Sequence, residues 1–242
     1  MRTDHQPGAL KRGLLREGAA YLGHGLLYGF GYLKNRHHPE RRRDLHTLVF
    51  VHGLGATRAS FFPLQTYLAW QGLDRQLAYN YRSRGASIEG LGIELKRRID
   101  DQVKGGRITL VAHSMGGLVA RVYLQMLGGD RRVDRLITLG TPHGGSHATA
   151  WVPTPLVSQL KPGGPFLEHL NGLPPPKGVE VLSIGASEDL MVLPADNSFC
   201  AFGEHHLLAG RGHLDMLFSR ELFRLVRDAA SVEAPMTVAE NA

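Results

Sequence analysis

An apolar run that ends at a serine flanked by small residues constrains this chain more than any other feature. Residues 107–117 read Arg-Ile-Thr-Leu-Val-Ala-His-Ser-Met-Gly-Gly, which predicts a buried strand, a sharp turn and the start of a helix. Strand and helix nearly touch in such a turn, so the positions two residues before and after the serine must be small, as Ala112 and Gly116 are. The pattern predicts that Ser114 is a nucleophile raised clear of a sheet, rather than an ordinary helix N-cap.

The rest of the chain from residue 47 alternates short apolar runs with helical patterns. Strands are predicted over residues 47–51, 76–81, 107–112, 133–139, 179–184 and 207–210, and helices over 62–70, 88–103, 115–127 and within 213–226. This alternation predicts an α/β domain with a mostly parallel central sheet and helices on both faces. Ligands bind such sheets at the carboxyl ends of the strands, and the chemically suggestive residues all follow predicted strands.

One domain is expected over residues 47–230, with a basic and apolar extension at 1–46 and a tail at 231–242. A chain of 242 residues suits a single hydrophobic core. An insertion at about 144–177 interrupts the alternation with seven prolines and several apolar side chains. A long insertion of this composition predicts a short lid over a site, and an ordinary surface loop with a short helix is the alternative.

The N-terminal extension carries most of the net charge. Residues 1–47 hold nine Lys and Arg against four Asp and Glu, a surplus of five, whereas the whole chain has a net charge of +6. The apolar, glycine-rich run at 19–32 is too short to span a membrane, and no small-residue cleavage site follows it. Peripheral contact with an anionic membrane, a helix packed on the domain and a flexible extension remain open as interpretations. Nucleic acid is not an expected partner, since no recognisable binding module accompanies the basic residues. A cytoplasmic or membrane-peripheral location is favoured.

A glycine-rich loop follows the first predicted strand, with Val-His-Gly-Leu-Gly at residues 51–55. The glycines allow this loop to approach the serine turn. The backbone N–H groups of Leu54 and of Met115, the residue after the serine, are therefore the expected donors to a developing oxyanion.

A serine hydroxyl becomes an effective nucleophile when a histidine accepts its proton and a carboxylate orients that histidine. When the serine lies on a strand-to-helix turn of a parallel sheet, the acid and then the histidine follow it along the chain. Asp189 lies in a turn just past the strand at 179–184, and Glu188 and Asp196 are the weaker candidates. His213 lies in a glycine-flanked loop before the last helix, where the general base is expected.

Several motifs resemble those of known lipases. Ala-His-Ser-Met-Gly-Gly at 112–117, His-Gly-Leu-Gly at 52–55 and Gly-His-Leu-x-x-Leu-x-Ser at 212–219 resemble the small bacterial lipases, including the minimal Bacillus type. Leu-Gly-Thr-Pro-His-Gly-Gly-Ser at 139–146 and Leu-Lys-Pro-Gly-Gly-Pro-Phe-Leu at 160–167 resemble the wider lipase group that includes inositol deacylases of lipid anchors. The resemblance implies the α/β-hydrolase fold, a triad of Ser114, Asp189 and His213, and an oxyanion hole at Leu54 and Met115. The minimal Bacillus enzymes lack an insertion like the one at 144–177.

The expected function is hydrolysis of carboxylic esters, with lipid esters as substrates and an acyl-enzyme intermediate on the serine. Phe61, His143, Phe166 and Leu167 are expected to contact the substrate, with His143 at the pocket floor. Neither a metal nor an organic cofactor is expected, because this chemistry uses protein groups alone. An acyltransferase with the same triad, a non-catalytic membrane-associated module, and a hydrolase of amides or thioesters are the alternatives.

Overall fold

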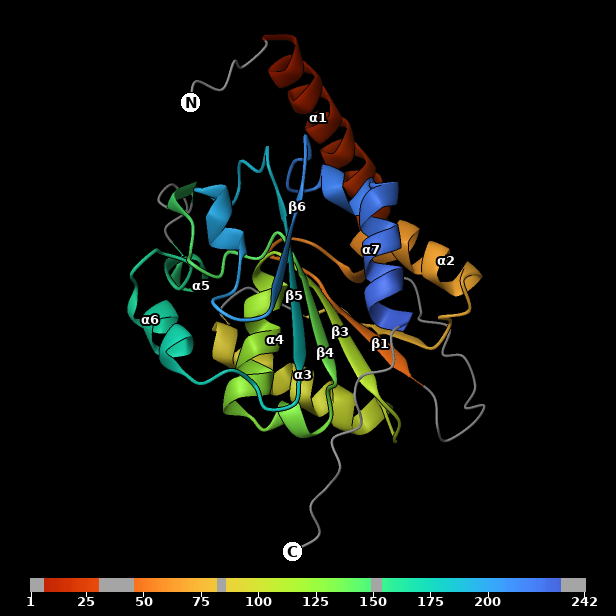
Figure 1. The fold of residues 1–242 in the computed structure, drawn as a ribbon, viewed down its shortest axis with the longest axis vertical. Helices are drawn as coiled ribbons and strands as arrows, with labels where there is room; N and C mark the ends of the chain where they lie inside the picture. The colour runs from red at the N-terminus through yellow and green to blue at the C-terminus, as the bar shows by residue number, and fades with distance from the viewer. Residues whose placement is uncertain (1–6, 31–45, 82–85, 149–153, 232–242) are drawn as a thin grey trace, which may run out of the picture.

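The computed structural model describes residues 7–30, 46–81, 86–148 and 154–231 (Figure 1). Within these residues one sheet contains six parallel strands in the spatial order β2-β1-β3-β4-β5-β6. The strands are β1 (Thr47–Val51), β2 (Gln76–Ala78), β3 (Ile108–His113), β4 (Arg135–Leu139), β5 (Glu180–Ala186) and β6 (Glu204–Leu208). This confirms the predicted α/β class with a parallel central sheet.

Successive strands are added on one side of β1 at first and on its other side from β3 onward. The chain places β2 on one side of β1, and then β3, β4, β5 and β6 on the other side. The loops that follow β1 and β3 therefore leave adjacent strands in different directions and open a crevice at their carboxyl ends. The His-Gly-Leu-Gly loop follows β1 and the serine turn follows β3, so both lie at this crevice.

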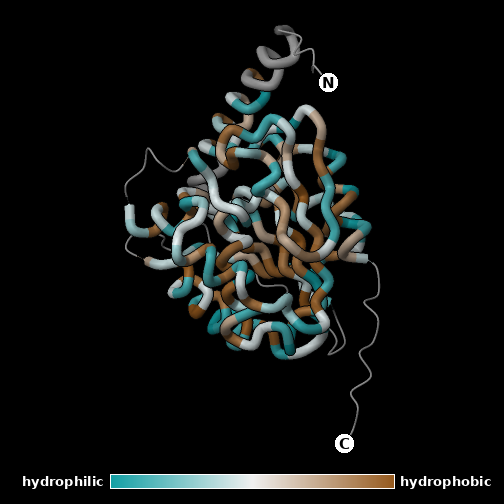
Figure 2. The backbone as a smooth tube through the Cα atoms, turned by 60° about the vertical axis from the view of Figure 1, so that its left-hand side comes forward, coloured by the Kyte–Doolittle hydropathy of each residue, from teal (hydrophilic) through white to brown (hydrophobic). Residues whose placement is uncertain are grey.

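Helices cover both faces of the sheet (Figure 1). One face carries α3 (Ile88–Gln102) and α4 (Met115–Met126), and the other carries α2 (Phe62–Trp70) and α7 (Arg220–Ser231). Alternate residues of β1 point to opposite faces, with Leu48 and Phe50 in one hydrophobic cluster and Val49 and Val51 in the other. Figure 2 shows the resulting pattern, with hydrophobic strands in the centre and hydrophilic segments outside.

Some predicted boundaries shift in the structure. The last strand lies at Glu204–Leu208 rather than at 207–210. The last helix begins at Arg220, because a short 3-10 helix, η5 (Asp215–Phe218), follows the glycine-flanked loop and Ser219 separates it from α7. The histidine of that loop is therefore separated from the final helix by a short 3-10 helix.

The insertion folds into two short helices, α5 (Pro155–Ser158) and α6 (Pro165–Gly172). Each begins with a proline in its first turn, where the missing N–H costs nothing. Leu167 and Leu170 of α6 are buried in the cluster that α4 also joins. Part of the insertion is therefore anchored on the core.

The N-terminal extension contains a long helix, α1 (Pro7–Phe30), that lies across the carboxyl end of the sheet (Figure 1). It packs against η5 and against the 3-10 helix η1 (Arg58–Phe61). The described residues of the extension thus form a helix packed on the domain. The basic residues between 34 and 43 and the tail at 232–242 lie outside the described residues. No helix in the described part of the chain has the length and apolar character needed to cross a membrane.

Candidate active site

Ser114 occupies the turn between β3 and α4 in a strained backbone conformation. Its φ is 55° and its ψ is −133°, and it is the single non-glycine residue with positive φ in the described chain. The backbone N–H of Ser114 donates to Leu139 O at 2.8 Å, which ties the turn to β4. A Cβ on Gly116 would overlap the carbonyl oxygen of Val51, so this position must be glycine for the helix to start so close to β1. These contacts hold the serine oxygen above the end of the sheet.

Ser114 and His213 lie within hydrogen-bonding distance, and Asp189 lies behind the histidine. His213 Nε2 is 3.0 Å from Ser114 Oγ, and His213 Nδ1 is 2.7 Å from Asp189 Oδ2. Because a carboxylate only accepts, Nδ1 carries the proton and Nε2 is left to accept from the serine hydroxyl. The three residues come from three separate loops at the carboxyl ends of β3, β5 and β6. This geometry is able to remove the serine proton as the oxygen attacks an electrophile.

The carboxylate of Asp189 is fixed by its own turn. Its Oδ1 accepts the backbone N–H groups of Met191 at 2.7 Å and Val192 at 2.8 Å, which leaves Oδ2 facing the imidazole. The side chain is buried. The two amide donors stabilise the ionised carboxylate in a position that water does not reach.

His113 supports the backbone of the histidine loop. Its Nε2 lies 3.1 Å from the carbonyl oxygen of His213, and the two rings are 4.7 Å apart. Burial lowers the pKa of His113 well below its usual value, and the neighbouring His213 lowers it further. A neutral ring with its proton on Nε2 is therefore the form that donates to this carbonyl.

The loop after β1 is held by His52 and Tyr81, which stack at 4.0 Å. His52 Nδ1 donates to Gly53 O at 2.9 Å, and the Tyr81 hydroxyl donates to His52 O. Burial lowers the pKa of His52 to about 4, so the ring is neutral near pH 7. An added Cβ on Gly53 would lie 2.8 Å from the Cβ of Ser114, which shows how closely this loop approaches the serine turn.

A cavity of about 310 Å³ opens beside Ser114 and His213. Most of its lining is apolar. Besides the serine turn and the histidine loop, the lining comes from α1, the loop after β1, the segment between β4 and α6, and the turn after Asp189. The lining residues outside the serine and histidine loops are Tyr21, His24, Gly53, Leu54, Gly55, Ala56, Pro142, Ser146, Ala148, Val157, Leu160, Met191 and Val192. The insertion therefore contributes one wall of the cavity. Within the described residues no cluster of His, Cys, Asp or Glu side chains is arranged to hold a metal ion.

Phe61, Phe166 and Leu167, which the sequence analysis expects to contact the substrate, lie away from the cavity lining. None of the three is among the described residues that line the cavity. Phe61 is fully buried and packs against Phe50 with ring centroids 5.1 Å apart. Phe166 and Leu167 pack onto the core cluster below the insertion. In this structure the three side chains pack against the hydrophobic core rather than facing the cavity.

His143 also lies outside the cavity lining, and its partners explain why. Its Nε2 is 3.0 Å from Thr138 Oγ1, and its Nδ1 lies 3.5 Å from the guanidinium of Arg121. Arg121 is itself buried and donates to Asn171 Oδ1 at 2.7 Å. Burial lowers the pKa of His143 well below its usual value, and Arg121 lowers it further. The histidine thus belongs to a buried polar network that joins α4 to α6.

The sequence interpretation missed the cavity residues on α1. Tyr21 and His24 line the cavity, and Glu17 reaches the histidine loop. The three positions are spaced four and three residues apart, so they share one face of a helix. This helical spacing of polar and aromatic side chains is the sequence signal for a functional face. The glycines and leucines between these positions make the face hard to recognise from the sequence alone.

The comparisons with known proteins agree with this architecture. The model of the alpha/beta hydrolase family matches residues 48–179, more than half of the chain. A lipase from Bacillus licheniformis, BlEst2 in its mature form, superposes with a TM-score of 0.67 at 18% identity, covering 84% of this chain and 99% of that one. Lipase B from Aspergillus fumigatus gives 0.66 at 16% identity over 78% of this chain and 53% of its own. Carboxylesterase CesB from Bacillus subtilis gives 0.55 at 14% identity over 87% and 97%.

The solved structures are too distant to show more than the fold, whereas the family model covers the loop after β1, the serine turn and the whole insertion. The chain belongs to the alpha/beta hydrolase family.

Proposed function

We propose that the protein is a serine esterase that hydrolyses carboxylic esters of lipids. His213 removes the proton of Ser114 as its oxygen attacks the ester carbonyl. The alcohol then leaves with that proton, and water activated by the same histidine cleaves the acyl-enzyme. Asp189 keeps the imidazole in the tautomer that accepts at Nε2. The hydrogen-bonded series from Ser114 through His213 to Asp189 is the observation that carries this proposal.

The backbone N–H groups of Leu54 and Met115 stabilise the oxyanion of the tetrahedral intermediate. Both residues line the cavity beside Ser114. The orientation of the Gly53 carbonyl supports the first donor: it accepts from His52 Nδ1 and from the Ala56 N–H at 3.3 Å. The carbonyl oxygen of Gly53 and the N–H of Leu54 belong to one trans peptide and point in opposite directions. The Leu54 N–H is thereby turned away from His52.

The apolar character of the cavity supports an ester with an apolar acyl group. Tyr21, Leu54 and Met191 line it and are also partly exposed to solvent, so the cavity has an apolar rim. An exposed apolar rim is favourable when the substrate is itself part of a lipid aggregate. The names of the solved neighbours, which include lipases and esterases, agree with this substrate class.

The outer face of α1 supports contact with an anionic lipid surface. Leu15, Leu22 and Leu26 are 74%, 74% and 77% exposed, and their spacing places them on one side of the helix. Lys11 and Arg12 precede them in the same helix. Apolar side chains combined with basic residues favour binding at an anionic membrane surface.

A panel of p-nitrophenyl esters from acetate to palmitate, compared between wild type and Ser114→Ala, tests the hydrolase. Turnover in wild type alone, rising with chain length, is expected. Turnover of thioesters or amides in preference to esters would assign a different substrate class, and esters formed with an added alcohol would indicate an acyltransferase. No turnover of any acyl donor by folded wild type would support a non-catalytic role.

Vesicle co-sedimentation tests the lipid contact. Wild type should sediment with phosphatidylglycerol vesicles more than with phosphatidylcholine vesicles, because Lys11 and Arg12 favour anionic headgroups. A variant with serine at positions 15, 22 and 26 should lose most of this binding. Equal sedimentation of the two proteins would refute a role for the outer face of α1.

A further inference from the structure

Glu17 of α1 binds the backbone on the C-terminal side of His213. Its carboxylate accepts the N–H of Leu214 at 2.9 Å with one oxygen and the N–H of Asp215 at 2.9 Å with the other. The residue is only 9% exposed, although a carboxylate is among the groups that are most costly to bury without partners. The two amides immediately after the general base are therefore fixed by a residue nearly 200 positions earlier in the chain, outside the segment that the family model matches.

The glycine before His213 gives independent support for this contact. A Cβ on Gly212 would overlap the Glu17 carboxylate. The φ of Gly212 is not in the left-handed region, so the backbone conformation does not by itself require glycine here. The space that glycine leaves is occupied by Glu17. The Gly-His pair of the loop and the carboxylate of α1 are thus complementary in shape.

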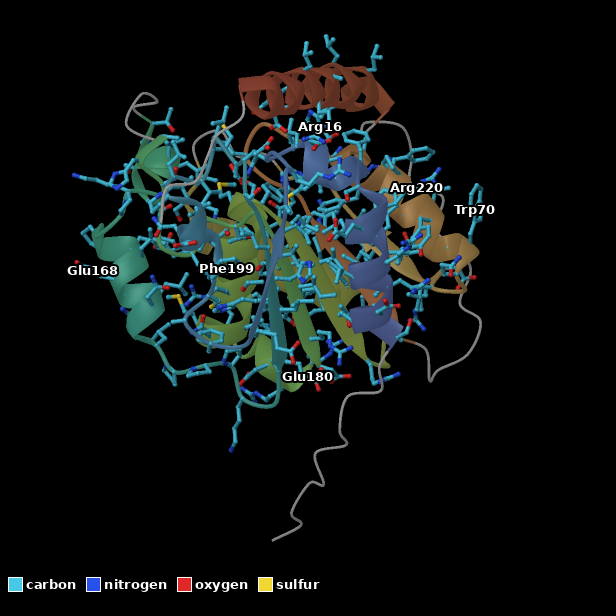
Figure 3. The ribbon with its side chains drawn as sticks, turned by 45° about the horizontal axis from the view of Figure 1, so that its top comes forward. Arg16, Trp70, Glu168, Glu180, Phe199 and Arg220 are labelled. Carbon is cyan, nitrogen blue, oxygen red and sulfur yellow. The ribbon has the colours of Figure 1, made fainter. Side chains whose placement is uncertain are left out.

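Two further contacts hold the same loop. Arg16 donates to the carbonyl oxygen of Gly210 at 2.5 Å, and His113 donates to the carbonyl oxygen of His213 at 3.1 Å. Arg16 also lies 3.6 Å from Glu188 and 3.9 Å from Asp215. In Figure 3 Arg16 lies at the junction between α1 and the C-terminal part of the chain. The loop is therefore held at its start, at His213 and at the residues that follow it, and α1 supplies two of these three attachments.

The same face of α1 continues into the substrate cavity. Tyr21 lies one turn beyond Glu17 and lines the cavity, and His24 lines it one turn further on. His24 Nε2 is 2.8 Å from Ser60 Oγ, and Ser60 donates its own proton to Thr57 O at 2.7 Å. His24 must therefore donate to Ser60, which anchors this end of the helix on η1. The helix is attached on both sides of the cavity.

We infer that α1 is an integral part of the active site, with Glu17 acting as a positioning residue for His213 and with Tyr21 forming a specificity-determining wall of the cavity. This inference rests on the proposed ester hydrolysis. Glu17 is not among the described residues that line the cavity, and it acts on the reaction through the backbone of the histidine loop. Tyr21 meets the substrate directly.

The two roles predict different kinetic effects. Without the Glu17 carboxylate two buried N–H groups lose their acceptor, and the loop shifts to satisfy them. A misplacement of about 1 Å at a catalytic group costs roughly 100-fold in rate. Glu17→Ala should therefore lower kcat about 10- to 100-fold with KM within about twofold of wild type. Tyr21→Ala should instead change KM and the preference for acyl-chain length, because it removes part of the cavity wall.

The experiment uses the full chain as wild type, Glu17→Ala, Glu17→Gln and Tyr21→Ala. Glu168→Ala is the charge-matched control, since Glu168 is exposed on α6 and lies away from the cavity lining (Figure 3). Each protein is titrated with a fluorophosphonate, so that kcat is expressed per reactive serine, and its Tm is recorded. Glutamine keeps one acceptor oxygen and places an N–H₂ group beside the second amide, so Glu17→Gln should fall between wild type and Glu17→Ala.

The outcomes separate this inference from the proposed function. Wild type that neither reacts with the fluorophosphonate nor cleaves esters would refute the proposed function. An active wild type, together with Glu17 variants whose Tm falls while kcat per reactive serine stays within twofold, would overturn the positioning role. If Glu17→Ala does not fold, Glu17→Gln decides between these outcomes. An unchanged chain-length profile in Tyr21→Ala would overturn the specificity role.

Discussion

The strained backbone at Ser114 predicts an inverted order of stability between two inactive variants. A φ of 55° with a ψ of −133° lies in a region that glycine adopts readily and other residues rarely adopt. Such strain costs about 1–3 kcal/mol, whereas the greater freedom of unfolded glycine costs about 0.5–1 kcal/mol. Ser114→Gly should therefore be more stable than Ser114→Ala by about 1 kcal/mol, within a range of roughly 0–2.5 kcal/mol.

The comparison isolates the backbone because both variants lack the hydroxyl that faces His213. At an ordinary helical position alanine is the more stable residue, by about 0.8–1 kcal/mol. Ala69 in α2 is exposed and supplies this control, since Ala69→Gly should lower stability. Urea unfolding gives the free energies, and in a domain of this size about 1 kcal/mol corresponds to about 2–4 °C in Tm. If Ser114→Ala proves more stable than Ser114→Gly by about 0.8–1 kcal/mol, as at an ordinary helical position, the backbone strain at this residue is refuted.

Three further predictions follow from the geometry. Gly116→Ala should destabilise the fold by about 1–3 kcal/mol in urea unfolding, because its Cβ would overlap a carbonyl oxygen of β1. Gly90→Ala should not destabilise α3, because its Cβ would meet only Ser87 Oγ at 3.5 Å, an ordinary van der Waals contact. Asp189→Asn should lower kcat roughly 10³- to 10⁴-fold in ester assays through loss of the correct His213 tautomer, and a smaller effect than tenfold would contradict that role. The pKa of His52 is lowered to about 4 in the folded protein. Below about pH 6.5 the imidazole therefore binds a proton in the unfolded chain but stays neutral in the folded chain. This difference should lower the free energy of unfolding by about 2 kcal/mol between pH 7 and pH 5. A His52→Asn variant should show a correspondingly flatter pH dependence in urea unfolding, and an identical slope would refute this assignment.

The parts of the site that depend on local backbone geometry were readable from the sequence. The serine turn requires small residues at fixed positions, and Ala112 and Gly116 show them. Asp189 and His213 each lie just past a predicted strand, and they are the expected acid and base because the strands of a parallel sheet end at the same edge. The structure places both within hydrogen-bonding distance of their expected partners.

The parts that depend on packing between distant segments were not readable. Phe166 and Leu167 are apolar and lie in the insertion, but composition does not tell which side of a short helix faces the core and which faces a cavity. His143 is near the serine turn in the fold, yet its role depends on Arg121, whose burial in α4 has no local signature.

The N-terminal helix is the largest difference between the sequence interpretation and the structure. From its charge and glycine content, the sequence indicates an extension outside the domain, whose role stays open. The structure instead places Glu17, Tyr21 and His24 against the catalytic loops and the cavity. Contacts of this kind join residues that are far apart in the chain, and a single sequence does not reveal such pairs.

The most direct test of the central claim is to locate the reactive residue. Wild type is treated with a fluorophosphonate, digested, and mapped by mass spectrometry, with Ser114→Ala and Ser158→Ala treated in parallel; Ser158 is an exposed serine of α5. The account predicts a single phosphonylated peptide containing Ser114, unchanged labelling of Ser158→Ala, and no labelling of Ser114→Ala. Labelling that persists in Ser114→Ala, or folded wild type that does not label while it cleaves esters, would contradict the assignment of Ser114 as the nucleophile.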